Sequence, residues 1–217
     1  MIGGAIFDMD GVLVDSHPVH MRAWERFLRS QGRPVSQQDL DFILEGRKRE
    51  EILRHFMGEL TPELLASYGQ QKETLFREES TNMKTIPGVT GFLDELRSAS
   101  LPMAVASCGG RGRVNHLLEQ LQLTQYFRFI ITGDDVQDGK PDPAIFLKTA
   151  RHLQIPPEDL LVFEDSVSGV RAACAAGMEC LGIADESRTE ELTKAGAKCV
   201  VRDFFHVNLG KITDLFS

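Results

Sequence analysis

Short apolar runs alternate with amphipathic stretches over most of this chain. The runs are typical of buried strands, which we predict at 5–7, 103–107, 129–132, 160–163, 180–184 and 199–201. Apolar residues spaced three or four apart predict helices at about 89–98, 112–121, 143–152, 167–176 and 188–195. Repeated strand–helix units favour right-handed crossovers and a parallel sheet covered on both faces. We therefore predict an α/β fold with a Rossmann-like parallel sheet.

A helical block directly follows the first strand and interrupts this alternation. We predict its helices at about 18–32, 36–44, 50–57 and 61–80. Ser36 and Thr61 are suitable N-cap residues, and Pro18 suits the first turn of a helix. A block inserted at this point indicates an α-helical cap domain, 16–84, on a core domain made of 1–15 and 85–217. Ligands of such sheets bind at the carboxyl ends of the strands.

The composition is that of an ordinary globular protein. Of 217 residues, 42% are hydrophobic and 26% are charged, so disorder is not expected. A net charge of −8 without a dense Lys/Arg run argues against nucleic acid as a partner. No apolar run approaches the roughly 20 residues that span a bilayer, and the first residues lack a signal-peptide pattern. We expect a cytoplasmic monomer without membrane contact, and we expect reduced cysteines because none form a Cys-x-x-Cys pair.

Two acids follow the first predicted strand. Asp8 and Asp10 face the same side if the strand continues to residue 10, although a turn there would change this; Gly11 permits a sharp turn. Two carboxylates this close repel, and a hard cation such as Mg²⁺ relieves the repulsion. The alternative is that Asp and Gly only mark the exit from a strand.

Three more polar groups follow later strands or turns. Ser107 ends an apolar strand before a glycine-rich loop and a helix, where a hydroxyl and backbone amides can hold phosphate oxygens. Lys140 lies between a turn glycine and a proline, and its ammonium could neutralise phosphoryl charge. Glu164 and Asp165 end another apolar strand. Each group alone has a structural alternative: a strand exit, a solvated lysine or a helix cap.

Together, in this order, the four strings resemble the four motifs of the haloacid dehalogenase superfamily. The resemblance covers the core almost end to end. It implies that Asp8 is the nucleophile that attacks phosphorus and that Asp10 is the general acid and base. It also implies that Ser107 binds phosphate, that Lys140 is catalytic, and that Mg²⁺ is held by Asp8, Asp10, Glu164 and Asp165, with Asp165 the firmer ligand of the last two.

Within the helical block, the resemblance narrows to the β-phosphoglucomutase-like branch. The string His20-Met-Arg-Ala-Trp resembles a segment whose histidine helps to position the acid/base aspartate. Arg49 resembles a cap arginine that grips a distal phosphate, and Lys72 matches the place of a cap lysine. We add Cys108, beside Ser107 in the glycine-rich loop, to these substrate-binding candidates; the alternative for Cys108 is a role in packing alone.

The resemblance implies a Mg²⁺-dependent phosphatase of a small phosphorylated metabolite, above all a sugar phosphate. The alternative is a β-phosphoglucomutase-type phosphomutase, which His20, Arg49 and Lys72 favour; Ser16, where the mutase pattern usually has Thr, argues for the phosphatase. A dehalogenase is disfavoured because that relative lacks the acid that Asp10 supplies. A non-catalytic regulator would be expected to lose one of the core motif residues.

Overall fold

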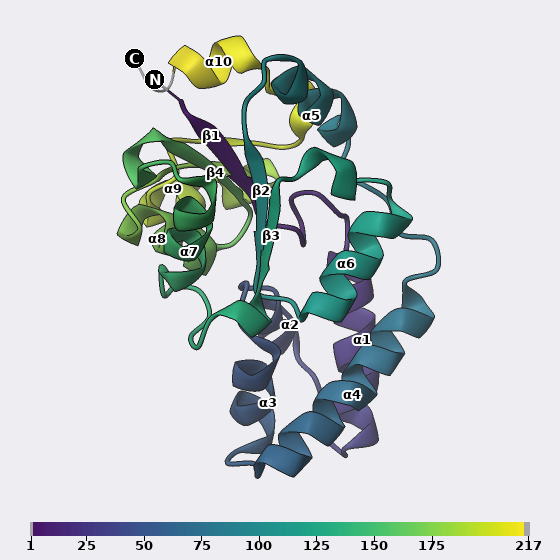
Figure 1. Ribbon diagram of the computed structural model, residues 1–217. Coiled ribbons are helices and arrows are strands. Elements are labelled where there is room, and N and C mark those ends of the chain that lie inside the picture. The colour runs from purple at the N-terminus through teal and green to yellow at the C-terminus, as the bar shows by residue number, and fades with distance from the viewer. Residues whose placement is uncertain (1, 215–217) are drawn as a thin grey trace.

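The computed structural model describes residues 2–214 and has a six-stranded, fully parallel sheet at its centre (Figure 1). The strands are β1 Gly4–Phe7, β2 Met103–Ser107, β3 Phe129–Thr132, β4 Leu160–Glu164, β5 Glu179–Ile183 and β6 Cys199–Val201. Their order, β3-β2-β1-β4-β5-β6, is that of a doubly wound Rossmann sheet. The predicted fold class is therefore confirmed, and β1 lies between β2 and β4 at the point where the strand order reverses.

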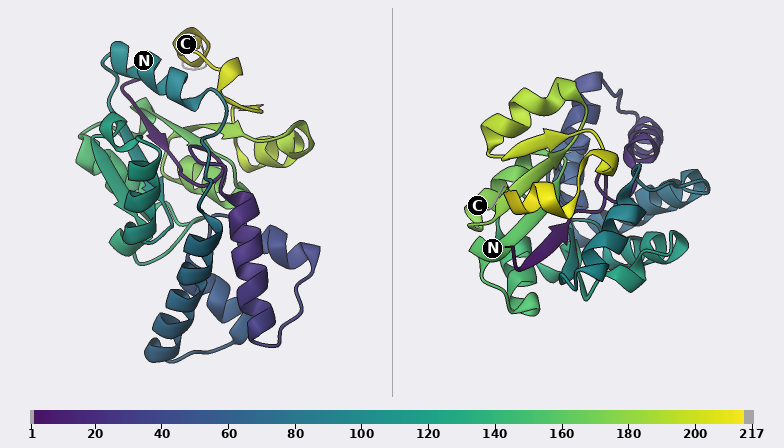
Figure 2. Two further views of the ribbon diagram at one scale, coloured as in Figure 1. Left: turned by 90° about the vertical axis from the view of Figure 1, so that its right-hand side faces the viewer. Right: turned by 90° about the horizontal axis from the view of Figure 1, so that it is seen from above.

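Helices cover both faces of this sheet, as the view from above shows (Figure 2). On one face the core includes residues of α5 Val89–Ser98, α6 Arg111–Gln120 and α10 Leu209–Asp214. On the other it includes residues of α7 Ala144–Leu153, α8 Val167–Ala175 and α9 Thr189–Ala195. Alternation along β1 sends Ala5 and Phe7 to the first face and Ile6 to the second. Apolar residues on both faces explain why β1 reads as a continuous apolar run.

Aromatic rings fill the core directly beneath the end of β1. Phe7 stacks on Phe163 with ring centroids 4.6 Å apart, and Phe92 meets the edge of both rings. The backbone N–H of Asp8 donates to the carbonyl of Phe163 at 3.0 Å. The ends of β1 and β4, and the acids that follow them, are thus fixed to each other by packing and by hydrogen bonding.

The four helices of the inserted block pack together beyond the carboxyl ends of the strands (Figures 1 and 2). They are α1 His17–Ser30, α2 Gln37–Ile43, α3 Arg49–Met57 and α4 Pro62–Glu79. They have an apolar cluster of their own, which includes Trp24, Phe27 and Leu53. The chain leaves and re-enters the core side by side, because the N–H of Asp15 donates to the carbonyl of Lys84. The division into a cap at 16–84 and a core stays a prediction.

Most predicted elements are confirmed to within a few residues. Ser36 caps α2 in a capping box with Asp39, and Pro18 lies in the first turn of α1, which begins one residue earlier than predicted. The helix α10 was not predicted, nor were five short 3₁₀ helices: Thr124–Tyr126, Gly133–Asp135, Pro157–Asp159, Glu186–Arg188 and Phe204–His206.

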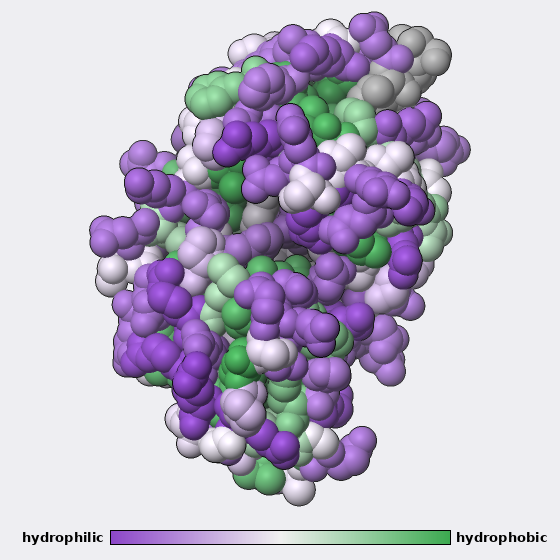
Figure 3. Space-filling model, turned by 180° about the vertical axis from the view of Figure 1, so that it is seen from behind, coloured by the Kyte–Doolittle hydropathy of each residue, from purple (hydrophilic) through white to green (hydrophobic). Residues whose placement is uncertain are grey.

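The surface opposite the view of Figure 1 is mostly hydrophilic, with small apolar spots between charged side chains (Figure 3). Among residues 2–214, the large apolar side chains that count as exposed are Leu64 and Phe205. No helix in this range is long and apolar enough to cross a bilayer.

Candidate active site

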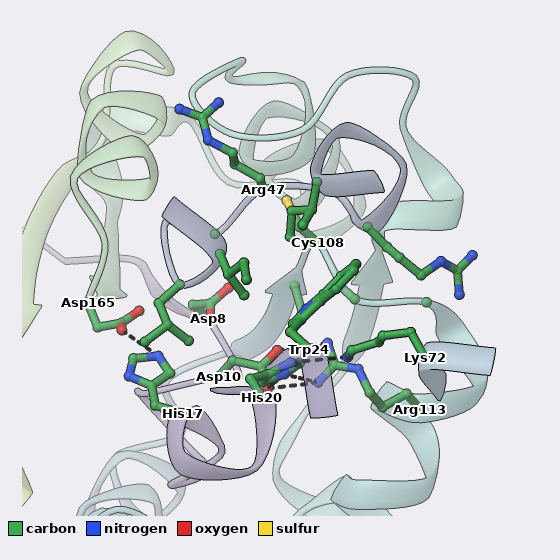
Figure 4. A pocket seen from close by; sticks show the side chains of 18 of the residues that line it. Asp8, Asp10, His17, His20, Trp24, Arg47, Lys72, Cys108, Arg113 and Asp165 are labelled. Atoms are coloured by element: carbon green, nitrogen blue, oxygen red, sulfur yellow. Dashed lines mark hydrogen bonds and ion pairs between the residues drawn. The ribbon is translucent and has the colours of Figure 1, made fainter. Parts of the chain in front are cut away.

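A cleft lies between the carboxyl ends of the strands and the cap helices. Its volume is about 690 Å³, counting the part open to solvent. Figure 4 shows its walls, to which α1, α2, α3, α4, α6 and the loops after β1, β2 and β4 contribute. Every predicted site residue except Lys140 lines this cleft: Asp8, Asp10, His20, Arg49, Lys72, Ser107, Cys108, Glu164 and Asp165. Lys140 is fully buried behind it and reaches Asp8 from there.

The ammonium of Lys140 connects the acids at the ends of β1 and β4. Its Nζ donates to Asp8 Oδ1 at 2.5 Å and also to Glu164 Oε1. Burial alone would lower the pKa of Lys140, but the two carboxylates outweigh it and raise that pKa well above its usual range. Lys140 therefore remains a buried cation, and a fixed charge away from water acts strongly on charged groups near it.

Burial raises the pKa of Asp8 well above its usual range; Lys140 opposes this, while Glu164, Asp10 and Asp165 add to it. The three acids act by repulsion, since each disfavours a charge on Asp8. One ammonium does not compensate this group of acids. A bound divalent cation would do so, and carboxylate oxygens are the ligands that Mg²⁺ prefers.

Glu164 is held by several donors. Its Oε2 accepts from the backbone N–H groups of Asp165 at 2.8 Å and Ser166 at 2.9 Å, and from the Ser166 hydroxyl at 3.1 Å. A Cβ added at Gly169, in the first turn of α8, would overlap the Glu164 carboxylate. Both carboxylate oxygens thus already have partners, and the carboxylate fits only because residue 169 has no side chain.

Asp10 lies at the end of a chain of polar side chains that runs into the cap. Its carboxylate accepts from Ser16 Oγ at 2.6 Å, lies 3.2 Å from His20 Nε2, and accepts two bonds of 2.8 Å from Arg113 (Figure 4). Burial alone would raise the pKa of Asp10, but Arg113 and His20 outweigh it and hold that pKa well below its usual range. Asp10 is therefore a carboxylate in this arrangement.

Lys72 continues this chain on the cap side. Its Nζ lies 3.2 Å from His20 Nδ1 and near the rings of Trp24 and Phe76. Burial and the charge of Arg113 lower the pKa of Lys72 to about 7, and burial and Lys72 lower the pKa of His20 to about 3. If a neutral His20 accepts a hydrogen bond from Lys72 at Nδ1, its own proton lies on Nε2. The Nε2–H group then donates a hydrogen bond to Asp10.

The loop after β2 supplies a hydroxyl and a turn. Ser107 is buried, and its Oγ accepts from the N–H of Gly109 at 3.2 Å. Cys108 is half-buried on the cleft wall, and burial raises the pKa of its thiol, so it is not an activated nucleophile.

Asp165 is the acid best suited to take a cation. Its Oδ2 is buried and lies 3.0 Å from His17 Nε2, which is its charge partner. Burial alone would lower the pKa of His17, but Asp165 raises it to about 9. Within residues 2–214, no group of three or more His, Cys, Asp or Glu side chains is arranged as a ready metal site. Asp8 and Asp165 fit Mg²⁺ by their chemistry, whereas the oxygens of Glu164 and Asp10 are engaged by protein donors.

The cleft also contains residues that the sequence did not single out. Arg113 and His17 hold Asp10 and Asp165, and Arg47 lies on the cap side, where its Nε is buried without a hydrogen-bond partner. The available signal for Arg113 was a second arginine soon after the glycine-rich loop. For His17 it was a histidine next to Ser16, at the start of a helix that follows the acid pair.

Comparisons with known proteins agree with this geometry. The chain is 36% identical over 203 residues to a phosphorylated carbohydrates phosphatase of Thermotoga maritima, covering 91% of this chain and 93% of that one. It is 30% identical to hexitol phosphatase A of Escherichia coli, covering 87% and 88%. The crystal structure of β-phosphoglucomutase from Clostridium difficile has the same fold, with a TM-score of 0.90, 24% identity, and coverage of 100% and 97%.

A family model described as haloacid dehalogenase-like hydrolase matches residues 5–183. This range contains all four motif strings, which are the ones with Asp8, Ser107, Lys140 and Asp165. The chain belongs to the haloacid dehalogenase-like hydrolase family.

Proposed function

We propose that this hydrolase is a Mg²⁺-dependent phosphatase of a small phosphorylated carbohydrate, acting through an aspartyl-phosphate. The observation that carries the proposal is the buried Lys140 ammonium, which bridges Asp8 to Glu164 at the base of the cleft. The names of two relatives support the substrate class, since one acts on phosphorylated carbohydrates and the other on hexitol phosphates. A monomer acting in the cytoplasm stays our prediction.

In the first step, Asp8 attacks phosphorus and forms a P–O bond. The bond from phosphorus to the leaving oxygen breaks, and that oxygen departs as an alcohol with a proton from Asp10, which takes up this proton from solvent when the negative charge of the bound ester lies beside it. In the second step, a water molecule attacks phosphorus while Asp10 takes its proton. The bond to Asp8 breaks and inorganic phosphate is released, which leaves Asp8 as a carboxylate and Asp10 protonated, as both were in the substrate complex.

The charge of the transferred phosphoryl group is balanced by fixed groups of this chain. Lys140 faces Asp8 from below, and Ser107 with the loop amides after it is proposed to bind phosphoryl oxygens from the side. Glu164 keeps the ammonium in place. Mg²⁺ would be held by Asp8 and Asp165 and would neutralise charge on the phosphoryl oxygens. Asp10 and Glu164 stay predicted ligands only, because their oxygens accept from protein donors here.

The cap side of the cleft is proposed to bind the carbohydrate. Trp24, Ile43 and Ile52 provide an apolar wall, and Arg49 and Lys72 provide positive charge. An aromatic face and a few polar groups are typical of small-molecule sites. Cys108 lies close enough to the phosphate-binding loop to contact the substrate, and we keep it among the proposed binding residues.

A phosphomutase is the second candidate. It is favoured by the contact of His20 with Asp10 and by the presence of Arg49 in the cleft, since a mutase must grip a second phosphate. It would return the phosphoryl group to another hydroxyl instead of to water.

The two candidates are distinguished by phosphorus NMR of the enzyme with Mg²⁺ and a panel of phosphate esters. The panel includes β-glucose 1-phosphate with a trace of the 1,6-bisphosphate. Free phosphate from one or a few carbohydrate phosphates, lost in Asp8→Asn, is the expected result. Conversion of the 1-phosphate to the 6-phosphate with little free phosphate would contradict the phosphatase proposal and support a mutase. If neither free phosphate nor the 6-phosphate forms, both candidates are wrong.

A further inference from the structure

Arg113 makes a two-point contact with the Asp10 carboxylate. Its Nη1 donates to Oδ1 and its Nη2 donates to Oδ2, both at 2.8 Å. The guanidinium also lies over the ring of Phe76, 5.1 Å from the ring centroid, and only 7% of the side chain is exposed. Parallel bonds of this kind fix the plane of a carboxylate as well as its position, which a single ammonium cannot do.

The path of Arg113 to Asp10 depends on the glycine-rich loop. Arg113 lies in the first turn of α6, which follows this loop, and a Cβ added at Gly109 would overlap the guanidinium. Arg111, two residues earlier, takes a different course: it pairs with Asp135 at 2.6 Å and is half exposed. The loop thus leaves room for one arginine to enter the cleft while its neighbour stays at the surface.

We propose that Arg113 is a positioning residue for Asp10, an inference that rests on the proposed phosphatase reaction. Three donors fix the carboxylate: Ser16 and His20 reach Oδ1, and Arg113 reaches both oxygens. Arg113 alone holds Oδ2 among the described residues. Without it the carboxylate is free to rotate about the contact at Oδ1, and the oxygen that exchanges a proton no longer has a defined place.

The step that Arg113 serves is the departure of the alcohol. The P–O bond to the leaving oxygen breaks, its electron pair stays on that oxygen, and a proton moves to it from Asp10, which is protonated in the substrate complex and is left as a carboxylate bound to Arg113. A sugar or alkyl oxygen is a poor leaving group and needs this proton. A 4-nitrophenolate leaves as an anion and does not.

This difference distinguishes positioning of Asp10 from direct binding of the phosphoryl group. If Arg113 bound the phosphoryl oxygens, its removal would slow every phosphate ester to a similar extent. If it positions Asp10, removal slows the esters with poor leaving groups and spares the others. The quantity to compare is kcat/KM, because it reports only the steps up to alcohol or phenolate release when that release is irreversible.

The experiment measures kcat/KM of wild type, Arg113→Met, Arg113→Lys and Gly109→Ala for a sugar phosphate and for 4-nitrophenyl phosphate. In Arg113→Met, we expect a loss of about 100-fold with the sugar phosphate and less than about 5-fold with 4-nitrophenyl phosphate. Arg113→Lys keeps the charge but not the two-point contact, and it should show the same imbalance to a smaller degree. Gly109→Ala should also reproduce it, because it displaces a guanidinium that is still present.

Arg111→Met is the matched control, and both of its rates should stay within about 2-fold of wild type, as for a surface substitution. Equal losses with both esters, or no loss with either, would overturn the positioning role. A wild type that hydrolyses neither ester would instead overturn the proposed function. Thermal unfolding of each variant identifies one that fails to fold, and the remaining variants then carry the test.

Discussion

At the scale of single residues, this site brings several charges of both signs out of water. Lys140 is fully buried, and Glu164 is almost so. Removing one partner of such a group is more harmful than the net stability of the pair suggests, because the other partner is left buried and unpaired. The side chains of the site are therefore also part of the structure, and substitutions there have two effects.

Lys140→Met should show both effects. We expect the free energy of unfolding to fall by about 3–5 kcal/mol and phosphate release to fall by at least about 1,000-fold, since Asp8 and Glu164 lose their shared cation. Chemical denaturation and a phosphate-release assay measure the two. Lys148→Met is the control, because Lys148 binds Asp135 near the surface and is 31% exposed. A Lys140→Met protein as stable as wild type would contradict the ion-pair account.

Lys72 should make stability depend on pH in a defined window. Its pKa is lowered from 10.5 to about 7 by burial. Between these values the unfolded chain binds a proton that the folded chain does not, so wild-type stability from this group rises with pH from about 7 to 10.5. Below pH 7 Lys72 is protonated in both the folded and the unfolded chain, so the loss of stability caused by burying its charge is at its full and constant value.

Lys72→Met removes this penalty. The variant should be more stable than wild type by about 1–3 kcal/mol below pH 7, and the gain should shrink as the pH rises toward 10.5. Thermal unfolding of both proteins across this range measures the difference. A gain that does not change with pH, or that grows at high pH, would contradict a Lys72 with a lowered pKa.

At the scale of elements, the sequence predicted the helices and strands in which buried apolar residues recur at regular spacing. β1, β2 and β4 have apolar residues on both faces and were predicted correctly. The described part of α10 spans six residues, too few for a clear period. The paired acids could be predicted because each pair directly follows a strand with a regular pattern, and Lys140 because it lies between a turn glycine and a proline.

The contacts of Arg113 and His17 could not be predicted in this way. Arg113 reaches Asp10 only because Gly109 leaves room for it, and His17 reaches Asp165 across two separate loops. These contacts depend on how loops from distant parts of the sequence meet at the edge of the sheet. Spacing along the chain carries no information on that meeting.

The close approach of α8 to Glu164 can be tested by adding one methyl group. Gly169→Ala places a Cβ where the Glu164 carboxylate lies, so the carboxylate and Lys140 must shift. We expect a loss of stability of about 1–3 kcal/mol and a loss of activity of at least about 10-fold.

Gly91→Ala is the matched control for this change. Gly91 is also helical, in α5, but a Cβ added there meets no atom within 4 Å. It should stabilise the protein by about 0.5–1 kcal/mol without a change in activity, since alanine is the better helix former. Gly169→Ala with normal stability and activity would mean that Glu164 does not depend on this approach.

At the scale of the whole molecule, the four inserted helices are joined to the rest of the chain by contacts beside the loop that carries Lys140. Lys48, before α3, donates to the carbonyls of Val136 at 2.9 Å and Gln137 at 3.1 Å. Glu51 accepts from the N–H of Gly139 at 3.2 Å, next to Lys140. We propose that these bonds hold the cap closed and couple its position to the loop that carries Lys140.

Lys48→Ala should weaken this closed position. We expect KM for the sugar phosphate to rise about 3- to 10-fold, because part of the binding energy is then used to close the cap. Steady-state kinetics measure it, with Arg54→Ala, an exposed change on α3, as the control. An unchanged KM and kcat would show that these bonds do not contribute to closure.

The proposed reaction depends on a covalent bond between Asp8 and phosphorus. The most direct test is to quench the enzyme during turnover with Mg²⁺ and a carbohydrate phosphate, to reduce the aspartyl-phosphate with borohydride, and to identify the resulting homoserine by peptide mass spectrometry. We predict homoserine at position 8 alone, and none in Asp8→Asn. Phosphate released by wild type with no modification at Asp8, or with modification of another acid, would contradict the account.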